Sequence, residues 1–464
     1  MTTRTAPVHR TFRQLAVKSP AELQFGRAPS PVACGFGLEL GAGRVYPELN
    51  FTLPTMPLDE AHWSAVVAHY EEIGEMILRA SQRLQLPGLM VEFELLPPMT
   101  ERPAWGAEVT ALLHCYLKQA HEEFGLPCAL RVTPTDIRDI TRPPILRSGE
   151  AWDCLRASFE QCATAGADVL SIESVGGKEV NDEAMLYGDV EGIVFALGVL
   201  APRDMEFLWD EIVAVCSASK VLPGADSACG FANTAMQLSW QGMLPEVLAA
   251  VVRAASAVRS LVAYERGAVG PSKDCAYEGP ILKAITGTAI AMEGKSASCA
   301  HFSPVGNIAA AMCDLWSNES VQNVRLLSGS APEAYLELLA YDCRLFNKAI
   351  ESGTEGAYQK LLVESDVHLS PQALVLSPES TIRLASAIVQ ESTHYRKTVA
   401  AAREAVRIIH DAVARDELRI NSQEREWLAR IERPLEGLPV DEEKLIGVAI
   451  EKYGHLFAPE SYGL

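Results

Sequence analysis

Short runs of apolar residues, several of them alternating with polar ones, recur along the first two thirds of the chain. The candidate strands are residues 89–94, 129–133, 168–173, 221–224, 261–266 and 324–327. Helical patterns separate the first three runs, with a repeat of about 40 residues, which is typical of parallel strand–helix units. We expect an α/β protein with a (β/α)8 TIM barrel; an open doubly wound sheet is the alternative. No Gly-x-Gly-x-x-Gly opens a helix, which disfavours a dinucleotide-binding sheet.

The two ends of the chain have different patterns. Residues 1 to about 60 are rich in Pro and Gly and predict an irregular arm, and a helical pattern follows over residues 59–86. From Ala331 onward the pattern is almost entirely helical, and Pro332 is typical of a first helical turn. We therefore expect an N-terminal arm and helix packed on the barrel (1–80), a catalytic barrel (81–330) and a helical C-terminal region (331–464).

Composition narrows the possible functions. The net charge of -20 disfavours binding to nucleic acid or to an anionic membrane. We find no secretory signal and expect no apolar stretch long enough to cross a bilayer. The 11 cysteines are scattered without the spacing of a disulfide framework, which favours a reducing compartment. We expect a cytoplasmic protein.

The alternation within residues 89–94 assigns the two faces of that strand. Its apolar residues should face the outer helices, so that Glu92 and Glu94 point into the barrel. Arg131 of the next strand shares this inner face, and we expect it to pair with Glu92 or Glu94. Whether the two glutamates act in catalysis or form a structural ion-pair network is left open.

Three potential zinc ligands follow three of the candidate strands. Glu173 ends residues 168–173, Cys229 lies just beyond 221–224, and Cys275 lies just beyond 261–266. The C-terminal ends of parallel barrel strands meet at one rim, where we expect these side chains to gather. Two thiolates and one carboxylate would hold zinc and leave a fourth position open, as in a catalytic site.

Other uses of the cysteines stay open. A free cysteine is usually buried and inert, and we expect this of the cysteines in helical patterns: Cys115, Cys154, Cys162, Cys216, Cys313 and Cys343. Cys229 and Cys275 lie instead in polar loops flanked by Gly and close to an Asp, although core packing is an alternative for both. Cys299 and His301 form a competing ligand pair, for which packing at a helix end is the alternative.

Four segments resemble motifs of the methanol:corrinoid methyltransferases, the zinc subunits of methanol:cobalamin methyl transfer. The segments are SIESVGGKE (171–179), CGFANTAM (229–236), GPSKDCAYEGP (270–280) and EGKSASCAH (293–301). The resemblance covers most of the chain and implies a TIM barrel with added helical regions. It implies zinc (Zn2+) bound by Glu173, Cys229 and Cys275. It also implies a corrinoid-binding partner protein, in an assembly built on a homodimer of the zinc subunit.

On this resemblance we expect an enzyme that transfers the methyl group of methanol to the reduced cobalt of a corrinoid. Hydroxide is a poor leaving group, so a Lewis acid and a proton donor would both help. The candidate proton donors are Glu92, Glu94, Asp226 and Asp274. The chain lacks an Asp-x-His-x-x-Gly signature, so we expect a separate corrinoid carrier. The N-terminal arm or this partner could cover the site.

Three other functions compete with this one. The same zinc and corrinoid chemistry could act on another small methylated alcohol, ether or thiol. A non-catalytic barrel could bind metal or dock a corrinoid protein, although it would have no need of all three ligands. A metal-free lyase is disfavoured because no lysine stands clearly at a strand end.

Overall fold

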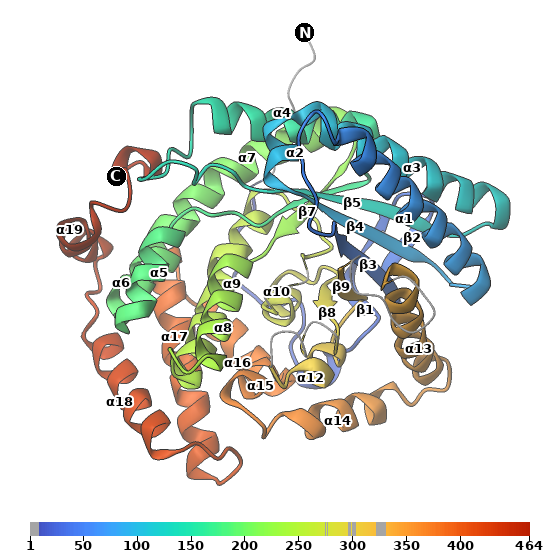
Figure 1. The fold of residues 1–464 in the computed structure, drawn as a ribbon. Coiled ribbons are helices and arrows are strands. Elements are labelled where there is room, and N and C mark those ends of the chain that lie inside the picture. Colours follow the sequence, from blue (N-terminus) through green and yellow to red (C-terminus); the bar gives the residue numbers. More distant parts are fainter. Residues whose placement is uncertain (1–8, 274, 276, 296–297, 299–302, 322–330) are drawn as a thin grey trace.

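The computed structural model describes residues 9–464 except 274, 276, 296–297, 299–302 and 322–330 (Figure 1). In these residues, seven parallel strands form one curved sheet in the order β7-β6-β5-β4-β3-β9-β8. The strands are β3 (Tyr46–Thr52), β4 (Leu89–Leu95), β5 (Cys128–Pro134), β6 (Val169–Ile172), β7 (Leu222–Asp226), β8 (Ala291–Glu293) and β9 (Leu315–Val321). The strands predicted over residues 89–94, 129–133, 168–173 and 221–224 are confirmed.

Residues 269–272 fill the gap between β7 and β8. The amide of Val269 donates to the carbonyl of Pro223 over 2.9 Å, and the amide of Ser272 donates to the carbonyl of Ala289 over 3.2 Å. This segment therefore takes the eighth position around the sheet, and β9 pairs with β3 to complete the ring. The predicted (β/α)8 barrel is confirmed.

The prediction of a strand over residues 261–266 is wrong. These residues end helix α9 (Glu246–Arg266), which is buried on all sides, so its apolar run has no polar face to reveal the helical period. By length and composition α9 would also suffice to cross a membrane, contrary to our expectation, but that window is entirely buried inside the protein. Helix α9 is therefore a buried helix of the barrel. The strand predicted over residues 324–327 lies outside the described residues.

Helices cover the outer face of the sheet. The longer ones are α1 (Trp63–Leu84), α3 (Pro103–Phe124), α4 (Glu150–Ala165), α7 (Ala201–Ser219), α9 and α13 (Ala331–Glu351). Shorter ones in the connections are α2 (Pro97–Glu101), α5 (Lys178–Tyr187), α6 (Val190–Phe195), α8 (Thr234–Trp240), α10 (Gly279–Thr286) and α12 (Gly306–Ala310). The outward residues Leu89, Val91 and Phe93 of β4 join one core cluster with these helices, as their alternation predicted.

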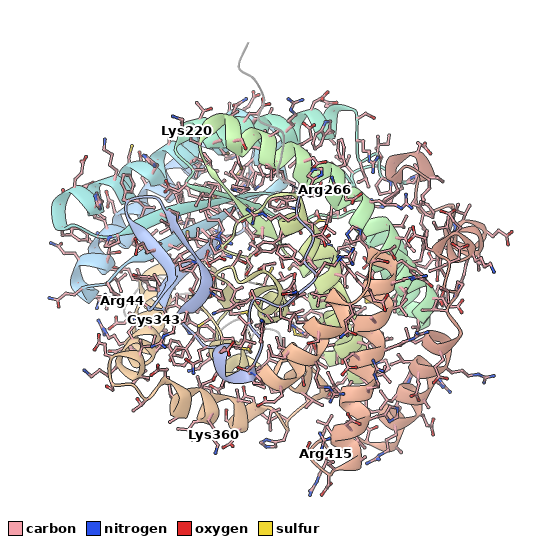
Figure 2. All side chains as sticks on the ribbon, turned by 180° about the vertical axis from the view of Figure 1, so that it is seen from behind. Arg44, Lys220, Arg266, Cys343, Lys360 and Arg415 are labelled. Atoms are coloured by element: carbon pink, nitrogen blue, oxygen red, sulfur yellow. The ribbon has the colours of Figure 1, made fainter. Side chains whose placement is uncertain are left out.

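The N-terminal region is more regular than predicted. It contains the hairpin β1 (Arg27–Cys34) and β2 (Leu38–Ala42), and β3 is itself a barrel strand. Cys34 and Leu38 of the hairpin pack with Met90 and Leu315 at the beginnings of the barrel strands. Figure 2 shows the hairpin, in blue, across this end of the barrel. The hairpin therefore closes the end opposite the C-terminal rim, which excludes it as the cover of a site at that rim.

The C-terminal region is helical, as predicted. It contains α14 (Glu355–Asp366), α15 (Pro371–Leu376), α16 (Pro378–Val389), α17 (His394–Ala414), α18 (Ser422–Gly437) and α19 (Glu442–Tyr453). Helix α17 packs against α9, and the region curves along one side of the barrel (Figure 1, orange to red). Helix α13 instead packs against β3, β9 and α1. We infer that the barrel runs from β3 to α13 and that the added helices begin after it.

Candidate metal centre

Glu173, Cys229 and Cys275 come together at the C-terminal rim of the barrel. Glu173 follows β6, Cys229 follows β7, and Cys275 follows the closing segment 269–272, so three neighbouring barrel positions supply them. One potential ligand atom from each lies within 4.8 Å of the other two. In the described part of the chain this is the one such group of His, Cys, Asp and Glu. The proximity that the sequence led us to expect is present.

Polar groups surround both sulfur atoms. Cys275 Sγ lies 2.8 Å from Glu173 Oε1 and 3.3 Å from Ser227 Oγ, and Asn233 Nδ2 donates to Cys229 Sγ over 3.6 Å. The hydrogen bond with Cys275 lowers the pKa of Cys229, but burial and nearby carboxylates outweigh it and raise that pKa to about 12. Burial also raises the pKa of Cys275 well above its usual value. A divalent cation here would supply the positive charge that favours both thiolates. Two sulfurs and one carboxylate are a donor set that fits zinc.

A buried lysine lies beside this group. Lys273 Nζ is 3.0 Å from Glu92 Oε1, 2.9 Å from Glu94 Oε1 and 3.5 Å from Glu173 Oε1. Thr133 Oγ1 donates to Glu92 Oε1 over 2.7 Å. The inward direction of Glu92 and Glu94 is as predicted, but we did not predict their contact with Lys273. The sequence offered one indication that Lys273 belongs to the site, namely its position two residues before Cys275.

Arg131 is buried inside the barrel, as its place in the alternation predicted. Its Nε atom forms an ion pair with Glu48 Oε1 at 3.0 Å, and its Nη1 atom donates to the carbonyl of Ser272 over 2.8 Å. We did not predict Glu48 as a partner, because β3 was assigned to an irregular arm.

Asp226, one of the predicted proton donors, does not point into the barrel. It pairs in register with Ile172, an outward residue of β6, and therefore faces the helices. Its carboxylate forms an ion pair with Arg259 at 2.9 Å and accepts a hydrogen bond from Trp209 Nε1 over 3.2 Å. It cannot reach a leaving group at the rim from that side of the sheet. The further candidates Asp274, Cys299 and His301 lie outside the described residues.

A cavity of about 400 Å³ opens above the rim, and Glu94, Glu173 and Gly230 are among the residues that line it. Of the proposed proton donors that the structure describes, Glu94 lines this cavity, whereas Glu92 is buried below it. Asp139 also lines the cavity and was not predicted. Its pKa is raised by burial first and by the neighbouring Asp136 second.

The loop after Glu173 is anchored from two sides. The amide of Val175 donates to Asp136 Oδ2 over 3.0 Å, and Asp136 forms a buried ion pair with Arg138 at 2.7 Å. The amide of Gly177 donates to the hydroxyl of Tyr462, close to the C-terminus, over 2.9 Å. These contacts hold the backbone of the loop independently of any bound ligand.

The remaining cysteines lie mostly in the core. Cys162, Cys216, Cys313 and Cys343 are buried as predicted, whereas Cys115 is exposed and Cys154 is half-buried, contrary to prediction. These two lie on the outer helices α3 and α4. All ten described cysteines are free, which agrees with the absence of a disulfide pattern in the sequence.

The fold and the clustered ligands define a TIM barrel with a candidate zinc site at its C-terminal rim. Residues 9–463 match the family model of the methanol-cobalamin methyltransferase B subunit. The methanol–corrinoid protein co-methyltransferase of Methanosarcina barkeri (strain Fusaro / DSM 804) is 37% identical over 459 residues, which are 97% of this chain and 99% of that protein. The crystal structure of the methanol:cobalamin methyltransferase complex MtaBC from Methanosarcina barkeri aligns with a TM-score of 0.93 and 37% identity, over 98% of this chain and 100% of that chain.

The chain therefore belongs to the methanol-cobalamin methyltransferase B subunit family. The family resemblance drawn from the four sequence motifs is confirmed.

Proposed function

We propose that this protein transfers the methyl group of methanol to the reduced cobalt of a corrinoid protein, with zinc bound by Glu173, Cys229 and Cys275. The observation that carries the proposal is the approach of these three ligand atoms to within 4.8 Å of one another at the barrel rim. The relative named above, a methanol–corrinoid protein co-methyltransferase, supports the same activity over almost the whole chain.

Each group at the rim has a defined task in this proposal. When bound, zinc supplies a Lewis acid for the oxygen of methanol. Glu173, Cys229 and Cys275 would hold the ion, and the cavity that Glu173 lines has room for a small alcohol. Two thiolates and one carboxylate around a divalent ion leave about one net negative charge, so a proton delivered to the departing oxygen lowers the barrier further. We assign that proton to Glu94, because its side chain lines the same cavity as Glu173. Three carboxyl groups share the single ammonium group of Lys273, and repulsion between like charges favours a proton on one of them.

The size of the cavity supports a partner protein. About 400 Å³ is far more than a one-carbon alcohol fills, so the remaining space can admit one face of a corrinoid. The related crystal structure is titled as a complex, MtaBC. We propose that a corrinoid-binding protein presents its cofactor here and thereby covers the site. A homodimer within a larger assembly, and a cytoplasmic location, stay predictions.

The same cavity volume also favours a second candidate, a larger methyl donor with unchanged zinc and corrinoid chemistry. A donor panel separates the two. The purified protein is assayed for zinc and then mixed with reduced cobalamin and methanol, a longer methoxy compound or methanethiol, and methylcobalamin is followed by its absorbance. We expect the highest rate with methanol; a higher rate with another donor would favour the second candidate.

Cys275→Ala tests whether the chemistry depends on the metal. We expect zinc and methyl transfer to be lost together, because two protein ligands hold the ion far less tightly than three. Cys115→Ala is the matched control, since Cys115 is exposed on α3, and it should keep both. Full methyl transfer by a zinc-free Cys275→Ala protein would rule the proposal out.

A further inference from the structure

The ammonium group of Lys273 is buried close to Glu173, one of the proposed metal ligands. The lysine side chain is fully buried, and its Nζ atom lies among two carboxylates of β4 and one from the loop after β6. We propose that Lys273 is a positioning residue: its ammonium group fixes the carboxylate of Glu173 in the orientation that metal binding requires. This inference rests on the metal site of the proposed function and adds a residue to it.

The geometry around the ammonium group supports this role. A lysine ammonium has three N–H donors, and three carboxylate oxygens lie around it: Glu94 at 2.9 Å, Glu92 at 3.0 Å and Glu173 at 3.5 Å. Glu92 is itself held by the hydroxyl of Thr133. The ammonium group is thus fixed on the β4 side of the barrel and can restrain Glu173 from there.

The Oε1 atom of Glu173 has contacts on two sides. Lys273 Nζ is 3.5 Å from it and Cys275 Sγ is 2.8 Å from it. The residue Glu173 is half-buried and lines the cavity, so it has room to rotate if one contact is lost. Groups that orient metal ligands through such contacts typically change metal affinity by about 10–100-fold when removed.

Charge and orientation act in opposite directions on metal affinity, so the test must separate them. Loss of a positive charge near the site would by itself strengthen the binding of a cation. The double variant Glu92→Gln/Lys273→Met removes one positive and one negative charge together, so the formal charge of the site does not change. It also removes both fully buried members of the ion pair between Glu92 and Lys273, and Glu94, which loses the same ammonium group, is partly exposed. A loss of affinity in this variant reports lost orientation.

A second buried ion pair offers a matched control. Lys283 Nζ lies 2.9 Å from Asp314 Oδ2, and both side chains are fully buried. Asp314 immediately precedes β9, at the N-terminal end of the barrel, away from the rim. Lys283→Met/Asp314→Asn is the same kind of neutral replacement and should leave zinc affinity unchanged.

The experiment measures zinc dissociation constants by competition with a chromophoric chelator, and the absorption spectrum of the cobalt(II)-substituted protein. We expect zinc binding by Glu92→Gln/Lys273→Met to weaken about 10–100-fold, with a changed cobalt spectrum. Lys273→Gln is the second variant, in case the double variant does not fold. Because it also removes a positive charge, it is judged by the cobalt spectrum, which should change since a neutral amide restrains Glu173 less than an ammonium group does.

The outcomes are distinguishable. Wild-type zinc affinity and an unchanged cobalt spectrum in a folded Glu92→Gln/Lys273→Met protein, or an unchanged cobalt spectrum in a folded Lys273→Gln protein, overturn the role of Lys273 alone. A wild-type protein that binds no zinc overturns the metal site itself, and the role of Lys273 with it. Equal weakening in the Lys283→Met/Asp314→Asn control would show a general effect of buried ion pairs and would also overturn the inference.

Discussion

Replacing Asp226 by asparagine removes the negative partner of Arg259 between the barrel sheet and its outer helices. Both side chains are fully buried and 2.9 Å apart. Removing one partner of such a pair leaves an uncompensated buried charge and destabilises a protein by about 3–5 kcal/mol. Asparagine keeps one acceptor oxygen, which Trp209 Nε1 or Arg259 can still use, so we expect a loss near the lower end, about 3 kcal/mol.

Thermal unfolding converts this loss into a measurable shift. At about 2.1 cal/mol/K per residue, the unfolding entropy of a chain this long is about 1 kcal/mol/K, so the Tm should fall by about 3 °C. Methyl transfer by the folded Asp226→Asn protein should change by no more than a few fold, because the side chain faces away from the rim. In an Arg259→Met background the same substitution should have a smaller effect on the Tm, as a double-mutant cycle reveals.

Two results would refute this reasoning. An unchanged Tm would show that the ion pair between Asp226 and Arg259 does not stabilise the barrel wall. A normal Tm and zinc content together with a loss of methyl transfer of about 100-fold or more would instead show that Asp226 is the proton donor, as the sequence had suggested.

Two further predictions concern the proton donor and the response to pH. Glu94→Gln should lower the rate of methyl transfer about 100-fold or more without changing the zinc content, as rate assays and metal analysis would show; an unchanged rate would exclude Glu94. Burial raises the pKa of Glu265, but the hydrogen bonds and charges of His394 and Lys397 outweigh it and lower that pKa below 4.5. The contact of α9 with α17 through Glu265 therefore stabilises the protein above about pH 4.5 and loses this effect as the pH falls further. The Tm difference between wild type and Glu265→Gln should shrink over that range; a constant difference would contradict the assignment.

Strands with clear alternation were predictable, and strands without it were not. Residues 89–94 and 129–133 alternate between an apolar outer face and a polar inner face, so both were found. Strand β3 contains Pro47 and lies within a region rich in Pro and Gly, which concealed it. The closing segment 269–272 is short and contains a Gly-Pro pair, while the apolar run just before it belongs to the buried helix α9.

The candidate site was predictable where a residue directly follows a strand. Glu173 and Cys229 were found in this way. Cys275 was included although the strand predicted before it, residues 261–266, is the end of helix α9. The face of the sheet on which Asp226 lies could not be predicted. The register between β6 and β7 shifts between Leu170 and Ile172, and beyond such a shift the alternation of residues no longer tells which face a side chain is on. The contacts of Lys273 were missed because its partners on β4 are about 180 residues away in the sequence, where only the closed barrel brings them near.

X-ray absorption at the zinc K-edge of the purified protein tests the metal centre most directly. We predict one zinc per chain with two sulfur ligands at about 2.3 Å and the remaining ligands oxygen at about 2.0–2.2 Å. The signal of one sulfur should disappear in a Cys229→Ser protein that retains the metal. A wild-type spectrum with no sulfur neighbour, or protein that cannot be loaded with zinc, would contradict the proposed centre.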